Sequence, residues 1–431
     1  MSHPFNESLL HYLWAHRRFD TASLITTQGN RIEVLSPGEY NLDAGPDFVH
    51  ARLLIDGLQW VGNVEIHLRS SDWHRHGHET DPLYANCILH VVWEDDVPVL
   101  GSDKKLLTTL ELKNRADMKL VDDYHRLMNR SDIVACKDAL QYIRPEVIHH
   151  WSERMAVERL ETRTAMMKRH LESTRGHWEE AFYFALARGF GFNLNGDPFE
   201  RLVRSVPFTL LLRLRDRPEI LSALFFGMAG FLDERFSHPE MAALRSDFIF
   251  LKKKWSLDIP SSLGWKFMRT RPANFPTVRL AQFISLYHLK TPVFSGFMAA
   301  QTLEELREIF VMNANIVSPG ISPSSLSMTS IGKSSINVLL INTVLPFLFL
   351  KGRSLGDLAL CDKALDYLEQ IEPEDHAIVR SFVSLGIKPR HAADSQGLLH
   401  LYRQYCSYKK CLNCEIGNQY LCRSALETTM G

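Results

Sequence analysis

The sequence has little that would place the protein in a membrane or export it. Its longest apolar stretch, residues 336–350, contains two asparagines and a proline and is shorter than the roughly 20 apolar residues that cross a bilayer. Residues 1–20 lack a positively charged start followed by an apolar run, so we expect no secretory signal there. We therefore expect a cytoplasmic protein without a membrane partner.

An excess of charge of one sign is also missing. The chain has 49 Lys and Arg against 50 Asp and Glu, a formal net charge of −1. No global attraction to nucleic acid follows from this balance, although a neutral total can contain a local basic channel. The 45% hydrophobic and 23% charged content is typical of a globular protein, and 431 residues predict two to three domains. The sequence has no fixed-length repeat, which excludes a regular solenoid.

Titratable side chains are concentrated between residues 41 and 93. Residues 61–69 alternate in polarity, so the apolar side chains at 64, 66 and 68 share one strand face and Glu65, His67 and Arg69 share the other. Residues 48–55 predict a preceding strand, and a tight connection at Gly57 would pair the two antiparallel. In such a hairpin Asp47 and Glu65 lie close together and could bind one cation.

Two short strings in this stretch resemble a family signature. Gly45-Pro46-Asp47 followed by Glu65-Ile66-His67 is similar to the PD-(D/E)xK motif of the restriction-endonuclease-like nuclease superfamily, with histidine in place of the final lysine. The expected elements have the superfamily's αβββαβ order: a helix at about 5–16, strands near 31–36, 47–55 and 60–69, a helical stretch near 71–86 and a strand at 88–94. Nearly the whole chain also resembles an uncharacterised bacterial family catalogued only as a domain of unknown function, which implies no activity.

The nuclease resemblance implies metal-dependent hydrolysis of phosphodiester bonds in nucleic acid. Asp47 and Glu65 would bind Mg²⁺ or Mn²⁺, and His67 would position or deprotonate the attacking water. Arg69 or the helix that begins near His149 would contact phosphates. Glu7, on the first predicted helix, would assist the metal or favour the start of that helix. Because His67 replaces a lysine, a second interpretation is a catalytically inactive scaffold that binds nucleic acid or protein.

The histidines support a third interpretation. The run that begins at Asp72 has histidines at positions 74, 76 and 78, and His90 lies on the following strand. Imidazole and carboxylate ligands suit Zn²⁺, Mn²⁺ or Fe²⁺. Histidines two positions apart do not share a helix face, so only some of the three can coordinate together. A transition-metal enzyme built on His67, His76 and His90 would act on a small molecule; otherwise the run is a polar surface loop and His90 a buried, hydrogen-bonded histidine.

The second half of the sequence predicts helices. Arg144-Pro145-Glu146 marks the start of a long helix, because proline suits a first helical turn. Residues 177–390 show helical periodicity and no strand pattern. We therefore predict an α+β fold with a nuclease-like core at residues 1–144 and an all-α domain at residues 145–431.

Four of the seven cysteines lie near the end of the chain, at Cys406, Cys411, Cys414 and Cys422. An odd number of cysteines without an export signal argues against a disulfide framework. A C-x₂-C pair with two flanking cysteines is compatible with a tetrathiolate Zn²⁺ site or a [4Fe–4S] cluster, and the alternative is a terminal helix with inert reduced thiols. The arrangement is similar to nuclease-like families that use an iron–sulfur cluster to join their ends.

Overall fold

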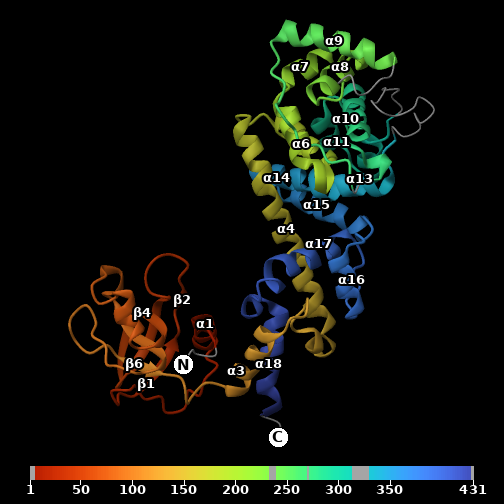
Figure 1. The fold of residues 1–431 in the computed structure, drawn as a ribbon. Coiled ribbons are helices and arrows are strands. Elements are labelled where there is room, and N and C mark those ends of the chain that lie inside the picture. The colour runs from red at the N-terminus through yellow and green to blue at the C-terminus, as the bar shows by residue number, and fades with distance from the viewer. Residues whose placement is uncertain (1–4, 233–238, 269–270, 313–329, 429–431) are drawn as a thin grey trace. The chain divides into compact units, whose positions relative to one another are not determined.

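The chain forms two compact units in the computed structural model, which describes residues 5–232, 239–268, 271–312 and 330–428 (Figure 1). Unit 1 comprises Met1–Trp151 and Leu401–Gly431, and unit 2 comprises Ser152–His400. Unit 1 contains a mixed sheet, whereas the described residues of unit 2 form helices, so the predicted α+β class is confirmed. We predicted one helical domain from residue 145 to the end, but the last residues group with unit 1, because the final helix packs against a helix of that unit.

The sheet of unit 1 has six strands. The order is β1 (Ile32–Ser36), β3 (Phe48–Ile55), β4 (Leu58–Arg69), β5 (Cys87–Glu94) and β6 (Thr109–Glu111), with β2 (Glu39–Tyr40) paired to β3. β1, β3 and β4 are antiparallel, whereas β5 runs parallel to β4 and β6 parallel to β5. The structure confirms the predicted hairpin, in which Gly57, at a φ of 82°, makes the turn from β3 to β4.

Two helices contact β4 and so flank the predicted site. α1 (Glu7–Ala15) lies within the predicted first helix and buries Leu9, Leu10, Leu13 and Trp14. α2 (Asp72–His76) is much shorter than the predicted helical stretch of 71–86. Gly77 ends it in the left-handed conformation, with the backbone N–H groups of residues 77 and 78 donating to the carbonyls of residues 74 and 73. The chain then turns back through a short 3₁₀ helix, η1 (Pro82–Tyr84).

The rest of unit 1 is helical. α3 (Met118–Asn129) lies in a region to which we assigned no helix from the sequence, and the Asp117 side chain caps it by accepting from the Leu120 N–H. η2 (Lys137–Tyr142) and the first turns of α4 (Pro145–Ser173) follow. After unit 2 the chain returns through the π-helical turn η6 (Tyr402–Cys406), the 3₁₀ turn η7 (Cys411–Asn413) and α18 (Glu415–Thr428). α18 packs beside α3 (Figure 1).

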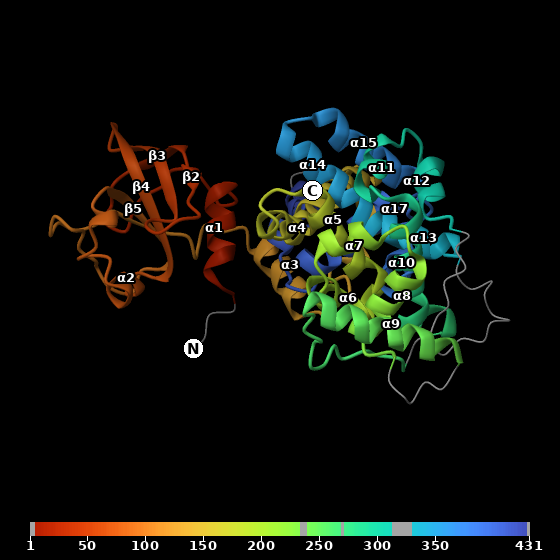
Figure 2. The same cartoon turned by 90° about the horizontal axis from the view of Figure 1, so that it is seen from above.

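The helices of unit 2 are drawn in Figure 2. They pack around an aromatic core that includes Phe182, Tyr183, Phe190, Phe283 and Phe347. Its described helices after α4 are α5 (Trp178–Phe190), α6 (Phe192–Arg204), α7 (Phe208–Leu214), α8 (Pro218–Met228), α9 (Pro239–Trp255), η3 (Pro272–Asn274), α10 (Pro276–Lys290), α11 (Val293–Ala299), α12 (Leu303–Ile309), α13 (Lys333–Leu339), η5 (Leu340–Val344), α14 (Leu345–Leu355), α15 (Leu358–Gln370), α16 (Ala377–Ser384) and α17 (Ala392–Leu401).

One helical stretch of the described residues, Lys333–Leu355, is long and apolar enough to cross a membrane. It runs through α13, η5 and α14 for 23 residues, so it is longer than the apolar stretch that we judged too short from the sequence. Most of its apolar window, 72%, is buried inside the protein, as in the core helix of a helical domain.

Candidate metal centre

The β3–β4 hairpin brings Asp47 and Glu65 together, as predicted. The strand register pairs Phe48 with Val64, which places the two acidic residues opposite each other. The Asp47 backbone N–H donates to Glu65 Oε2 over 3.1 Å, and the Ile66 N–H donates to Asp47 Oδ2 over 2.9 Å. Backbone hydrogen bonds therefore fix both carboxylates. From α1, His11 places its Nε2 3.3 Å from Asp47 Oδ2.

Three histidines lie together beside Glu65. Ligand atoms of His67, His76 and His78 all lie within 4.8 Å of one another. His67 Nε2 lies 3.1 Å from His76 Nδ1 and 3.4 Å from Glu65 Oε1. His78 Nε2 lies 3.3 Å from the same Glu65 oxygen. We call these four side chains the histidine centre, in which Glu65 contacts His67 and His78.

The end of α2 explains why His76 and His78 meet. Residues two positions apart point in different directions on a helix, but Gly77 stops the helix and reverses the chain between them. The ring of His78 then stacks on Tyr84 of η1 with 3.8 Å between centroids. His74, on the other side of α2, is exposed and lies 3.3 Å from Glu79. The sequence therefore predicted correctly that only some of the three histidines come together.

His90 lies on β5, where it is the register partner of Glu65, and its ring contacts the His67 ring. Its Nε2 is 2.9 Å from His67 Nδ1, and its ring packs beside Trp73. The interpretation based on His67, His76 and His90 therefore needs correction, because His78 occupies the place predicted for His90. The role of His78 could have been predicted from Gly77, because a helix that ends at this glycine brings residue 78 back toward the sheet. A partner at one ring nitrogen fixes the tautomer and orientation of a metal-binding histidine.

Burial keeps the inner rings neutral. It lowers the pKa of His67 to about 2, with the neighbouring rings of His90, His78 and His76 acting in the same direction. It also lowers the pKa of His90 to about 3. Burial raises the pKa of the Glu65 carboxyl, although the hydrogen bond from His78 acts to lower it. Neutral imidazole and carboxylate are the forms that bind divalent metal ions, so the histidine centre has the donors of a metal site.

The family model described as Protein of unknown function (DUF2851) matches residues 7–377. The chain belongs to this family. Comparisons with curated proteins and with solved structures found no match. The predicted membership of a domain-of-unknown-function family is thus confirmed, whereas the nuclease resemblance stays a prediction. The range matched by DUF2851 contains Asp47, Glu65 and the three converging histidines and ends before the terminal cysteines.

The centre is more enclosed than the strand pattern predicts. We expected Glu65, His67 and Arg69 on an open face, but only 5% of Glu65 and 1% of His67 is exposed, because α2 and the segment after it cover them. Arg69 is half-buried at the end of β4. His76 is exposed and the Asp47 side chain is 23% exposed, so the centre meets solvent at these two residues.

Two further predicted residues lie beside the centre. Glu7 is half-buried at the start of α1, and burial raises its pKa. The charges of His11, Asp47 and His76 also change this pKa, which indicates that Glu7 lies near the solvent-facing side of the centre. Asp72 is buried, and its carboxylate bonds to groups outside the histidine centre. It accepts from the Arg69 backbone N–H over 3.3 Å and pairs with the Arg75 guanidinium at 3.0 Å, which fixes the start of α2.

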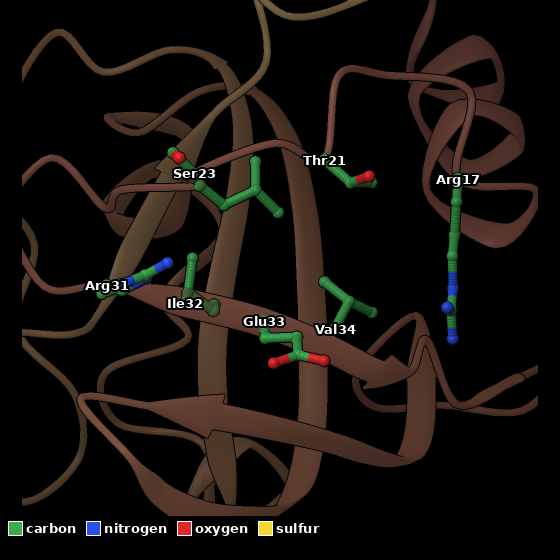
Figure 3. Close-up of a pocket in the computed structure, with 8 residues that line it drawn as sticks. Arg17, Thr21, Ser23, Arg31, Ile32, Glu33 and Val34 are labelled. Atoms are coloured by element: carbon green, nitrogen blue, oxygen red, sulfur yellow. The ribbon is translucent and has the colours of Figure 1, made fainter.

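Two cavities in unit 1 contain none of the predicted site residues. One, of about 430 Å³, is lined by Arg17 and Thr21 after α1 and by Arg31 and Glu33 at β1 (Figure 3). The other, of about 300 Å³, has Trp73 and Tyr84 among its lining residues, with the chain around residues 101–108. Because Tyr84 stacks on His78, this second cavity adjoins the wall of the histidine centre.

A metal or cluster at the predicted terminal cysteines stays a prediction. Cys406 ends η6, Cys411 begins η7 and Cys414 follows it, whereas Cys422, on α18, has its Sγ 3.8 Å from the Tyr12 hydroxyl. The charges of Cys414 and Cys411 also act on the buried Cys136, which we did not predict as a neighbour of the terminal cysteines. The sequence offers no signal for it, because it lies far from the others along the chain.

Proposed function

We propose that unit 1 is a metal-dependent hydrolase that cleaves phosphodiester bonds in nucleic acid. The observation that supports this function is the meeting of Asp47 and Glu65 with His67, His76 and His78 at one end of the β3–β4 hairpin. Of the two predicted ions, this donor set favours Mn²⁺, because Mg²⁺ is bound mainly by oxygen whereas imidazole suits transition metals.

The three histidines and Glu65 would hold the ion. When bound, the metal neutralises charge on the phosphoryl oxygens and lowers the pKa of a bound water. Both ring nitrogens of His67 face other side chains, so His67 serves as a ligand and not as the base predicted from the sequence. Asp47 and His11, paired at the solvent-facing side, are the groups placed to take the proton from an attacking water.

Positive charge near the opening supports an anionic substrate. The Arg75 side chain is 69% exposed on α2, next to His76, and its charge lowers the pKa of His67. Its Nη1 pairs with Asp72, and a guanidinium has further N–H groups that can donate to a phosphate. Arg75 thus takes the role that we predicted for Arg69.

The experiment compares cleavage by the full chain and by Glu65→Gln in Mn²⁺, in Mg²⁺ and in chelator. Labelled single-stranded DNA, duplex DNA and RNA are the polymeric substrates, and bis(p-nitrophenyl) phosphate is a small phosphodiester that needs no nucleic-acid binding. We expect cleavage in Mn²⁺ and a loss of at least about 100-fold in Glu65→Gln, because water activation depends on the bound ion. Asp43→Asn, an exposed acid of the same segment, is the matched control and should keep full activity.

Equal rates for wild type and Glu65→Gln would contradict the proposal. Wild type that binds nucleic acid with no turnover on any substrate would instead support the catalytically inactive scaffold. Hydrolysis of the small phosphodiester alone, lost in Glu65→Gln, would keep the metal chemistry and exclude nucleic acid as the substrate.

A further inference from the structure

The cavity of about 300 Å³ in unit 1 shares a wall with the histidine centre. Two of its lining residues contact the centre directly. The Tyr84 ring stacks on His78 with 3.8 Å between centroids, and the Trp73 ring meets the same histidine edge-on at 5.3 Å. Trp73 also belongs to α2, the helix that supplies His76. A ligand in this cavity would therefore lie next to the histidine centre.

A short hairpin at residues 100–106 fixes another wall of the cavity. The Gly101 N–H donates to the Lys105 carbonyl over 2.9 Å, which closes the turn. The Trp73 indole donates to the Leu100 carbonyl over 3.1 Å, which joins the hairpin to α2. These bonds order the wall before a ligand binds, and such preorganisation lowers the entropy cost of binding.

The remaining walls combine aromatic rings with apolar side chains. Trp73 and Leu107 belong to a small apolar cluster against which Tyr84 packs. Trp60, on β4, also lines the cavity and is 48% exposed, although it is a large aromatic side chain. A concave site with mainly apolar and aromatic walls is typical of small-molecule binding, and about 300 Å³ is at the small end of such sites.

The same walls carry polar groups that make no hydrogen bond within the described part of the chain. They are the indole N–H of Trp60, the hydroxyls of Tyr84 and Thr108, and the side-chain amide of Asn86. Together they offer both donors and acceptors. The edge of a nucleobase presents the complementary mixture, and its flat face stacks on aromatic side chains.

We propose that this cavity binds the base of the nucleotide next to the phosphodiester bond that is cleaved. The inference rests on the proposed function, because it names a subsite for the same nucleic-acid substrate. Trp60 stacks on the base, and Asn86 and Thr108 bond to its edge. Because the Tyr84 ring lines the cavity and stacks on His78, a base held there brings its own phosphate close to the histidine centre.

The first test measures binding without metal or cleavage. Chelator-treated full-length protein is titrated calorimetrically with AMP, GMP, CMP and UMP, and with ribose 5-phosphate, which has the sugar and phosphate but no base. We expect at least one nucleotide to bind at least about 10-fold more tightly than ribose 5-phosphate. Trp60→Ala should weaken that binding by about 10-fold or more because stacking is lost, and Trp60→Phe should restore most of it.

Tyr142→Ala is the matched control for this variant. Tyr142 is an exposed aromatic residue of unit 1, at 58% exposure, and does not line the cavity. It should leave the nucleotide affinity unchanged. Equal affinity for ribose 5-phosphate and the nucleotides, or a Trp60→Ala variant that binds them as tightly as wild type does, would overturn the base subsite.

The second test uses cleavage in Mn²⁺ of a single-stranded oligonucleotide and of an abasic oligonucleotide with the same backbone. Trp60→Ala should raise KM for the first at least about 10-fold more than for the second.

The two tests separate the subsite from the hydrolase. Nucleotide binding that depends on Trp60, in a protein that cleaves no phosphodiester, would support the subsite and overturn the proposed function. Cleavage in which Trp60→Ala changes KM equally for both oligonucleotides would overturn the subsite and leave the hydrolase standing.

Discussion

His67 is the most enclosed donor of the histidine centre. Its Nδ1 faces His90 and its Nε2 faces both His76 and Glu65. A ring held at both nitrogens has one tautomer and one orientation, so the geometry of the site is set before any ion arrives. The outer donors, His76 and His78, come from a short helix end and complete the set.

At this scale we predict how single histidines affect metal binding. His78→Ala should weaken Mn²⁺ affinity by at least about 100-fold because it removes a ligand, and His90→Phe by about 10- to 100-fold because it frees the His67 ring. Isothermal titration with Mn²⁺ measures both. His74→Ala, an exposed histidine of the same helix, should leave the affinity unchanged; equal weakening by all three variants would contradict the assignment.

The same histidines predict a pH dependence of stability in the metal-free protein. The folded pKa values of His67 and His90, about 2 and about 3, are depressed from 6.5. Below about pH 6.5 the unfolded chain therefore binds protons that the folded chain does not, and stability falls as the pH falls, by up to about 1.4 kcal/mol per pH unit for each ring. The raised pKa of Glu65 has the opposite effect on stability. As the pH falls through this folded pKa, the folded chain binds a proton before the unfolded chain does, which stabilises the folded state.

Urea unfolding of chelator-treated protein at pH 7.5 and pH 5.5 measures this dependence. Wild type should lose more stability over this interval than His90→Phe, which has one titrating ring fewer. A wild type that is equally stable at both values, or a variant with the same loss, would contradict the neutral, buried state of these rings.

At the scale of elements, the end of α2 decides whether the site forms. Gly77 has a φ of 73° and no atom within 4 Å of the position that a Cβ would take, so Gly77→Ala costs only conformational energy, about 1–2 kcal/mol. It should also weaken Mn²⁺ binding, because a backbone that relaxes out of the left-handed conformation at residue 77 displaces His78. Gly29→Ala, with a φ of 87° and equally open surroundings, should cost similar stability without changing the metal affinity; a normal affinity in Gly77→Ala would exclude this role for the turn.

The elements that could be predicted are those determined by a short stretch of sequence. Period-two alternation and Gly57 were sufficient for the β3–β4 hairpin and hence for the meeting of Asp47 and Glu65. The capping residue Asp117 and the apolar spacing after it also predict α3, which we missed. Cys136 could not be predicted, because no local pattern links it to Cys406. The enclosure of His67 depends equally on tertiary packing.

At the scale of the whole molecule, the chain leaves unit 1 after Trp151 and returns to it at Leu401. Unit 1 is therefore complete only when its two segments join.

The proposed function requires that the histidine centre binds the ion that drives phosphodiester hydrolysis. Its most direct test is a Mn²⁺ titration of the full chain in which electron paramagnetic resonance measures bound metal and the same samples are assayed for cleavage. We expect the rate to rise in proportion to occupancy of one tight site, and Glu65→Gln to lose both signals together. A site that fills with no cleavage, or cleavage that persists when the site is empty, would contradict the proposed function.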